Sequence, residues 1–135
     1  MSRRQLSVVG AMIEDVEGRY LITQRRAEAT LPLLWEFPGG RVEEGESHAQ
    51  ALVRELKELL DVVGEVDEQV LHTRHEYPDY DIDFRVFRAR LKGPPEAIRH
   101  LRVNDHRWVT LEQMSQYKFP DADARTLERL LDLKA

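Results

Sequence analysis

The sequence predicts an α/β protein in which a mixed β-sheet is flanked by helices. Apolar runs of strand length are separated by turn residues such as glycine, proline and aspartate. Two capping boxes, Ser47 with Gln50 and Thr110 with Gln113, mark the starts of helices. Strands and helices do not follow one another as repeating βαβ units, which favours a mixed sheet over a purely parallel one. Because no repeat or linker divides the chain, residues 1–135 are predicted to form a single domain.

The first half of the chain is predicted to contain two paired strands, a loop and a long helix. The Asp-Val-Glu-Gly turn signal at 15–18 separates two apolar runs and predicts a hairpin. The helix begins at Ser47 and packs onto the sheet through Leu52, Val53 and Leu56. The predicted elements are a buried strand at 6–13, a return strand at 19–24, a loop at 27–34, a short extended segment at 35–37 and a helix at 47–60.

The second half is predicted to contain three strands and two helices. Gly93, Pro94 and Pro95 interrupt the chain after the first two of these strands. The predicted elements are strands at 70–76 and 81–91, joined around Pro78, a short strand at 106–109, a short helix from Thr110 and a last helix at 121–133 with its leucines on one side.

Composition narrows the class of protein and its partners. Apolar residues make up 41% and charged residues 33%, the balance of a soluble globular protein, and no apolar run approaches the length of a membrane span. The chain has no cysteine, which excludes disulfides and thiolate metal sites. A net charge of −5 argues weakly against nucleic acid as the main ligand. We therefore expect a cytoplasmic protein without membrane or nucleic-acid partners, either a monomer or a homodimer.

The segment 39–62, GGRVEEGESHAQALVRELKELLDV, carries the chemistry. Gly40 is followed by five residues and Glu46, and seven further residues lead to Arg54. At about 100° per helical residue, Arg54, Glu55 and Glu58 fall on one side. Glu55 and Glu58 are i,i+3 neighbours, close enough to share an ion. Ala51 is predicted on the same side as these charges, and the opposite side is formed by Ala49, Leu52, Val53, Leu56 and Leu60.

This segment resembles the Nudix box of pyrophosphohydrolases acting on nucleoside-diphosphate-linked compounds. That box reads Gly, five residues, Glu, seven residues, then Arg-Glu-apolar-any-Glu-Glu-any-Gly-apolar. The chain departs from the box at Leu59, in place of the second glutamate of the pair, and at Asp61, in place of glycine. The matching positions are Gly40, Glu46, Arg54, Glu55, Leu56, Glu58 and Val62. The resemblance implies an α/β/α sandwich and a hydrolase.

Hydrolysis of a phosphoanhydride requires neutralisation of phosphate charge and activation of a water molecule. Mg²⁺ or Mn²⁺ does both, and these ions prefer oxygen ligands. We expect Glu55, Glu58 and the carbonyl of Gly39 or Gly40 to hold the ion, and Glu55 to be a ligand or the base. Arg54 and Glu46 are predicted to shape the loop and helix. Alternatively, these charges form an ordinary solvated helix face.

Two departures bear on the metal site. In the family, the glutamate at the position of Leu59 is usually a main metal ligand, and leucine can instead join the apolar stripe. Many MutT-type members carry a further metal-binding glutamate about six residues before a tryptophan, and Arg102 occupies that position here. Asp105 or Glu96 could replace it.

The resemblance narrows to MutT-type enzymes, which cleave nucleoside triphosphates to a monophosphate and pyrophosphate. It is carried by the segments 23–27 (TQRRA), 34–40 (LWEFPGG), 107–109 (RWV) and 119–123 (FPDAD). The resemblance implies that the base contacts Asp123, and we place Phe119, Arg25 and Arg26 at the same substrate site. Asp123 could equally cap the last helix, and the paired arginines could be solvated.

Trp35 and four of the histidines are assigned structural rather than ligand-binding roles. Trp35 is interpreted as core rather than as a wall of the base pocket. His72, His75, His100 and His106 show no metal-ligand spacing and are predicted to be structural or exposed.

Two functions from different classes fit these observations. The first is a metal-dependent nucleoside triphosphate pyrophosphohydrolase with a thinned metal site, acting in nucleotide-pool sanitation. The second is a Nudix-like module that binds a nucleotide and turns it over weakly or not at all. The retained Glu55 and Glu58 favour the first function, whereas Leu59 favours the second. A pure interaction domain is a third, weaker possibility.

Overall fold

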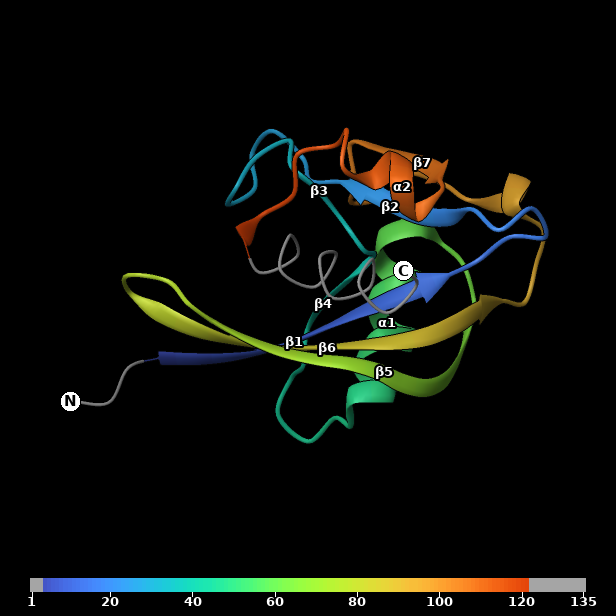
Figure 1. Ribbon diagram of the computed structural model, residues 1–135. Coiled ribbons are helices and arrows are strands. Elements are labelled where there is room, and N and C mark those ends of the chain that lie inside the picture. Colours follow the sequence, from blue (N-terminus) through green and yellow to red (C-terminus); the bar gives the residue numbers. More distant parts are fainter. Residues whose placement is uncertain (1–3, 122–135) are drawn as a thin grey trace.

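The computed structural model describes residues 4–121, which form two sheets and two α-helices (Figure 1). None of the helices in this part of the chain is long and apolar enough to cross a membrane. The predicted last helix, at 121–133, falls almost entirely outside the described residues. The elements are β1 (Arg4–Ile13), β2 (Tyr20–Gln24), β3 (Trp35–Glu36), β4 (Gly39–Arg41), α1 (His48–Leu60), β5 (Gly64–Glu76), β6 (Tyr80–Leu91), the 3₁₀ turn η1 (Pro95–Ala97), β7 (Asp105–Val109) and α2 (Leu111–Met114).

The larger sheet is mixed, as predicted. Its strand order is β4-β1-β6-β5, in which β1 and β6 run parallel and the other pairs are antiparallel. A second sheet of three antiparallel strands, in the order β3-β2-β7, was not expected from the sequence. The hairpin of β5 and β6 extends away from the smaller sheet, toward the left of the view in Figure 1.

The predicted hairpin of the first two strands is wrong. The turn itself forms, and the Asp15 carboxylate accepts hydrogen bonds from the backbone N–H groups of Glu17 and Arg19. Beyond one isolated bridge between Glu14 and Tyr20, however, β1 and β2 belong to different sheets. The reason is that β1 already pairs with β6 along one edge and with β4 along the other, so β2 pairs with β3 and β7 instead.

Helix α1 begins at His48 with the predicted Ser47 as its N-cap, and both bonds of the Ser47–Gln50 capping box are present. It ends at Asp61, which adopts the left-handed conformation (φ 56°, ψ 41°) that glycine usually provides. Its backbone N–H donates to the carbonyl of Lys57. The short helix α2 likewise begins with the predicted Thr110–Gln113 box.

The buried face of α1 is rotated from the predicted one. Leu52, Leu56 and Leu60 are fully buried, and Leu59 packs against the same cluster. Ala51, predicted on the charged side, is also fully buried, whereas Val53 is 38% exposed and Ala49 is exposed. The apolar stripe is therefore centred between Leu52 and Leu59 rather than on Leu52 and Val53, which brings Glu55 close to the protein interior.

Two hydrophobic clusters lie on opposite faces of β1. Val9, Ala11 and Ile13 face the cluster that includes α1, whereas Met12 faces the cluster that includes α2 and Phe119. This alternation follows the two-residue period of a strand. The glycine-containing strand β4 pairs with β1 and contacts α1, so the helix and the glycine pair meet at one end of the larger sheet.

Candidate active site

Arg54 connects helix α1 to the loop that precedes it. Its guanidinium makes two bonds with the Glu46 carboxylate, at 2.7 Å and 3.0 Å, and a third, at 2.9 Å, with the carbonyl oxygen of Arg41. The hydrogen bond to Arg54 holds the pKa of Glu46 below its ordinary value, and the same contact raises the pKa of Arg54. Glu46 also accepts a hydrogen bond from the backbone N–H of Glu43, which closes the loop.

Arg54 also contacts the two glutamates that follow it on the same face of the helix. Its Nη1 lies 2.7 Å from Glu55 Oε1 and 3.3 Å from Glu58 Oε2. The three side chains that sequence reasoning placed together are thus in direct contact, and Glu46 joins them from the loop.

Glu55 points at the backbone of the glycine strand β4. A Cβ atom added to Gly40 would collide with the Glu55 carboxyl group, so only glycine allows this close approach. A Cβ atom on Gly39 would collide with the carbonyl oxygen of Val9 across the sheet. Burial raises the pKa of Glu55, and the hydrogen bond from Arg54 opposes that effect.

Glu58 is more exposed and has a second arginine beside it. Nη1 of Arg102 lies 3.8 Å from Glu58 Oε2. The loop that carries Arg102 is fixed at the end of α1, because the backbone N–H groups of Leu101 and Arg102 both donate to the carbonyl of Leu59. The partly buried Leu59 side chain packs against the core. A cation therefore lies beside Glu58 at the position where the resemblance implied a carboxylate.

Neither alternative carboxylate lies in this group. Asp105 accepts a hydrogen bond from the backbone N–H of His106 and forms an ion pair with Arg107. Glu96 lies in the exposed turn η1.

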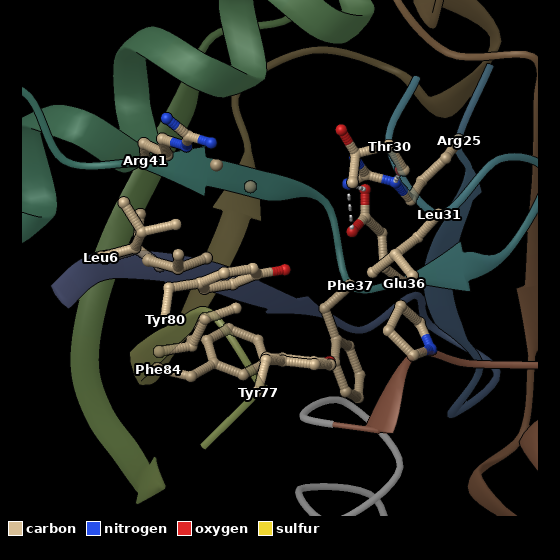
Figure 2. A pocket seen from close by; sticks show the side chains of 16 residues that line it. Leu6, Arg25, Thr30, Leu31, Glu36, Phe37, Arg41, Tyr77, Tyr80 and Phe84 are labelled. Atoms are coloured by element: carbon tan, nitrogen blue, oxygen red, sulfur yellow. Dashed lines mark hydrogen bonds and ion pairs between the residues drawn. The ribbon is translucent and has the colours of Figure 1, made fainter. Parts of the chain in front are cut away.

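A cavity of about 170 Å³ opens beside the glycine strand. The rings of Tyr77, Tyr80 and Phe84 gather on one side of it, and Arg25 and Glu36 lie on the other (Figure 2). Tyr77 and Tyr80 come from the turn of the β5–β6 hairpin, and their rings stack with centroids 5.1 Å apart. The lining residues are Leu6, Val8, Val9, Arg25, Thr30, Leu31, Glu36, Phe37, Gly39, Gly40, Arg41, Tyr77, Tyr80, Ile82, Phe84 and Pro120.

Arg25 and Glu36 form an ion pair in the wall of this cavity, at 3.2 Å. Burial raises the pKa of Glu36, and Arg25 opposes that effect. Arg25 Nε also donates to the carbonyl of Thr30 at 2.6 Å. Sequence reasoning selected Arg25 but missed Glu36, Tyr77 and Tyr80. For Glu36 a signal existed, because it is a charged residue between the aromatic residues Trp35 and Phe37.

The other predicted substrate residues are placed differently. Arg26 is exposed and is not among the residues that line the cavity. Phe119 is buried in the core, where its ring meets Phe37 edge to face, and the next residue, Pro120, lines the cavity. Asp123 lies outside the described residues. Trp35 packs against the core and meets Tyr117 edge to face, which agrees with its interpretation as a core residue.

The histidines correct one expectation from the sequence. His72 bonds to Asp83 at 2.6 Å, as expected of a structural residue. His100 and His106, whose spacing in the sequence indicated no metal site, are brought together with Asp105, and their potential ligand atoms all lie within 4.8 Å of one another. The group was not predictable from spacing, because His100 lies in the loop after η1 whereas Asp105 and His106 belong to β7, and only the path of the loop brings them together.

The chain is similar to known proteins over most of its length. A family model described as a NUDIX domain matches residues 8–129. The chain is 35% identical over 135 residues to the CTP pyrophosphohydrolase of Escherichia coli (strain K12), covering 98% of this chain and 96% of that protein. It is 30% identical over 133 residues to the 8-oxo-dGTP diphosphatase of Haemophilus influenzae (strain ATCC 51907 / DSM 11121 / KW20 / Rd), with coverage of 98% and 96%. Among solved structures, the E. coli ORF135 protein superposes with a TM-score of 0.83 at 34% identity, covering 98% of this chain and 93% of that chain.

Proposed function

The chain belongs to the Nudix hydrolase family, and from that premise we propose that it hydrolyses a nucleoside triphosphate to a monophosphate and pyrophosphate with the help of Mg²⁺ or Mn²⁺. One observation carries this proposal. The Glu55 carboxylate of α1 lies against Gly40 of the glycine strand β4, Arg54 joins it to Glu58, and both glycines of that strand line the aromatic cavity. A single bound nucleotide could therefore place its phosphates at the carboxylates and its base in the cavity.

The relatives support the substrate class. One is named for CTP and the other for 8-oxo-dGTP, and both compounds are nucleoside triphosphates. Because these bases differ, the names support the triphosphate more strongly than any particular base. We propose that the base lies against the tyrosines of the hairpin turn, since stacking on aromatic rings tolerates different bases. Asp123, with Arg25, Arg26 and Phe119, remains our proposed set for recognition of the base.

The residues present fit a hard divalent ion. The proposed donor set is entirely oxygen: the carboxylates of Glu55 and Glu58 and the carbonyl of Gly39 or Gly40. The absence of a side chain at Gly40 lets the Glu55 carboxylate approach the backbone. When bound, the ion neutralises phosphate charge and acidifies a water molecule.

We assign the protein groups as follows. Glu58 is the main ligand, and Glu55 is a ligand or accepts the proton of the attacking water. That water forms a bond to phosphorus as the bond to the departing pyrophosphate breaks. Because burial raises its pKa, Glu55 is a stronger base than an exposed glutamate. Arg54 fixes the direction of the Glu55 carboxylate and, through Glu46, the loop beneath the phosphates.

The test is a pyrophosphate-release assay across CTP, dCTP, dGTP and 8-oxo-dGTP, with Mg²⁺ and then Mn²⁺. We expect metal-dependent release that falls by about 10²- to 10⁴-fold in Glu55→Gln. Glu44→Gln, which changes an exposed glutamate in the preceding loop, is the matched control and should retain activity. Equal activity in the two variants would remove Glu55 from the mechanism.

A second candidate is a nucleotide-binding module with very slow turnover. Leu59 at a position of the metal-binding face and Arg102 beside Glu58 favour it, because an uncharged side chain and a cation both lower the negative charge available to a metal ion. Tight nucleotide binding without pyrophosphate release in either metal would select this alternative.

We further propose that residues 1–135 form one domain, which the match over residues 8–129 supports. We also propose a cytoplasmic monomer or homodimer without nucleic-acid partners. The acidic balance of the chain supports the last of these points.

A further inference from the structure

A second group of metal-ligating side chains lies outside the glycine strand and the charged face of α1. His100, from the loop after η1, meets Asp105 and His106, from the start of β7, with all potential ligand atoms within 4.8 Å of one another. Nε2 of His100 and Nδ1 of His106 are 2.7 Å apart, and the rings meet at 72°. The two nitrogens face one another in a hydrogen bond, and an ion bound here would take the place of the proton between them.

The backbone holds these residues in place without any ion. Asp105 and His106 pair with Gln24 and Thr23 in the smaller sheet. The two neighbours of His100 are fixed as well, because the N–H groups of Arg99 and Leu101 donate to the carbonyls of Leu60 and Leu59. A ligand that binds here does not have to order the chain first, which lowers the cost of binding.

The chemistry of the group selects one class of ion. Two imidazole nitrogens and one carboxylate oxygen suit Zn²⁺ and similar transition metals, whereas Mg²⁺ prefers an all-oxygen shell. Tetrahedral Zn²⁺ places its nitrogen ligands roughly 3.3 Å apart, so the two rings must separate by about 0.6 Å. His100 is exposed and can make this movement. The carboxylate of Asp105 is oriented by Arg107 and by the N–H of His106, as metal ligands in proteins usually are by neighbouring groups.

We propose that His100, Asp105 and His106 form a binding site for Zn²⁺ or a similar transition-metal ion, separate from the carboxylates that serve hydrolysis. Water completes the coordination. The site joins β7 to the loop that carries Arg102, and Arg102 lies beside Glu58. An ion here would therefore also hold Arg102 at its place next to the hydrolytic carboxylates.

The inference can be tested without measuring hydrolysis. Zn²⁺ is titrated into the full chain by calorimetry, in an excess of Mg²⁺ that occupies the oxygen-rich site. We expect one Zn²⁺ per chain, with affinity lower by at least about 10-fold in His100→Ala and in His106→Ala, because even the loss of a group that only orients a ligand costs that much. Co²⁺ should give the absorption of a nitrogen- and oxygen-ligated ion in the wild type and lose it in both variants.

Two controls separate this site from its surroundings. His72→Ala removes a histidine that is paired with Asp83, and Glu58→Gln removes a hydrolytic carboxylate; both should leave Zn²⁺ binding unchanged. His106→Ala alters a strand, so circular dichroism checks its fold, and the exposed His100→Ala decides the question if His106→Ala does not fold. Zn²⁺ binding that is absent in the wild type, unchanged in His100→Ala or lost in Glu58→Gln overturns the proposal. None of these results depends on whether the chain hydrolyses nucleotides.

Discussion

At the scale of single residues, the Arg54 guanidinium contacts two carboxylates, those of Glu46 and Glu55, whose pKa values are shifted in opposite directions. Glu46, in the loop, has its pKa lowered by Arg54, whereas burial raises the pKa of Glu55, on the helix. Arg54 therefore stabilises the charged form of Glu46, which supports the loop. It also orients the carboxylate of Glu55, which we propose takes part in hydrolysis. The two roles can be separated by the pH at which each is lost.

Glu46→Gln should alter the pH dependence of stability. Because the folded-state pKa of Glu46 is lowered from its ordinary value of 4.5, its carboxylate stabilises the fold above that value, and this stabilisation disappears as pH falls through the lowered pKa. Wild type should therefore exceed Glu46→Gln in free energy of unfolding at pH 7 and approach it in acid. Urea denaturation at a series of pH values measures this difference. A gap that stays constant down to pH 3, or an equal gap in Glu44→Gln, would contradict the assignment.

Leu59 is the residue at which restoring charge should increase activity. Leu59→Glu adds a carboxylate next to Glu58 on the helix. Its negative charge would offset part of the positive charge of Arg102, which lies beside Glu58. The half-buried leucine packs against the core, so the change should cost about 1–3 kcal/mol of stability. We expect faster pyrophosphate release in the folded variant. Leu59→Gln is the matched control, because it has a similar packing cost without the charge. No gain over Leu59→Gln would show that the missing carboxylate does not limit the site.

At the scale of secondary-structure elements, helix α1 depends on its first turn. Both bonds of the capping box are formed there, Ser47 Oγ accepting from Gln50 N–H and Gln50 Oε1 accepting from Ser47 N–H. Ser47→Ala should lower the free energy of unfolding by about 1 kcal/mol, whereas Ser47→Gly should cost only a few tenths, roughly, because glycine is itself tolerated at this position. Thermal denaturation of both variants tests this order, and a larger loss in Ser47→Gly would refute it.

Elements were predictable from sequence where a local interaction defines them. The two capping boxes fixed the starts of α1 and α2, because a side chain three residues from the cap completes each one. The start of β5 was missed by several residues, since register shifts between Val66, Gln69 and Leu71 break the alternation of apolar and polar residues. The false hairpin has a different cause: strand pairing depends on which edges distant strands already occupy, and local sequence does not record this.

At the scale of the whole molecule, the candidate site combines what sequence could predict with what it could not. Arg54, Glu55 and Glu58 share one helix face, so their proximity followed from helical spacing. The cavity instead joins β1, the Arg25–Glu36 pair and the turn of the β5–β6 hairpin, which are far apart in the chain. The parallel pairing of β1 with β6 places Tyr80 opposite Arg4, at the first residues of the two strands, and so brings the hairpin turn to this end of β1. The roles of the site residues, Asp123 included, stay predictions.

Tyr80→Ala tests whether this assembled cavity receives the base. Tyr80 lines the cavity and stacks on Tyr77, while the carboxylates that we propose for hydrolysis belong to α1, where Glu55 lies against Gly40. Stacking of a base on an aromatic ring contributes about 1–3 kcal/mol, so KM for a triphosphate should rise by about 5- to 150-fold. The value of kcat at saturation should change much less, because Glu55 and Glu58 keep their positions.

Tyr80→Phe is the matched control, since it keeps the ring and removes only the hydroxyl; it should retain a KM near that of the wild type. Inorganic triphosphate, which has no base, supplies a second comparison, and Tyr80→Ala should leave its KM unchanged. If the loss instead appears in kcat with KM unchanged, or if inorganic triphosphate is affected equally, the hairpin turn acts on the phosphate end and the base lies elsewhere. Steady-state kinetics with both compounds therefore decides which end of the substrate the cavity holds.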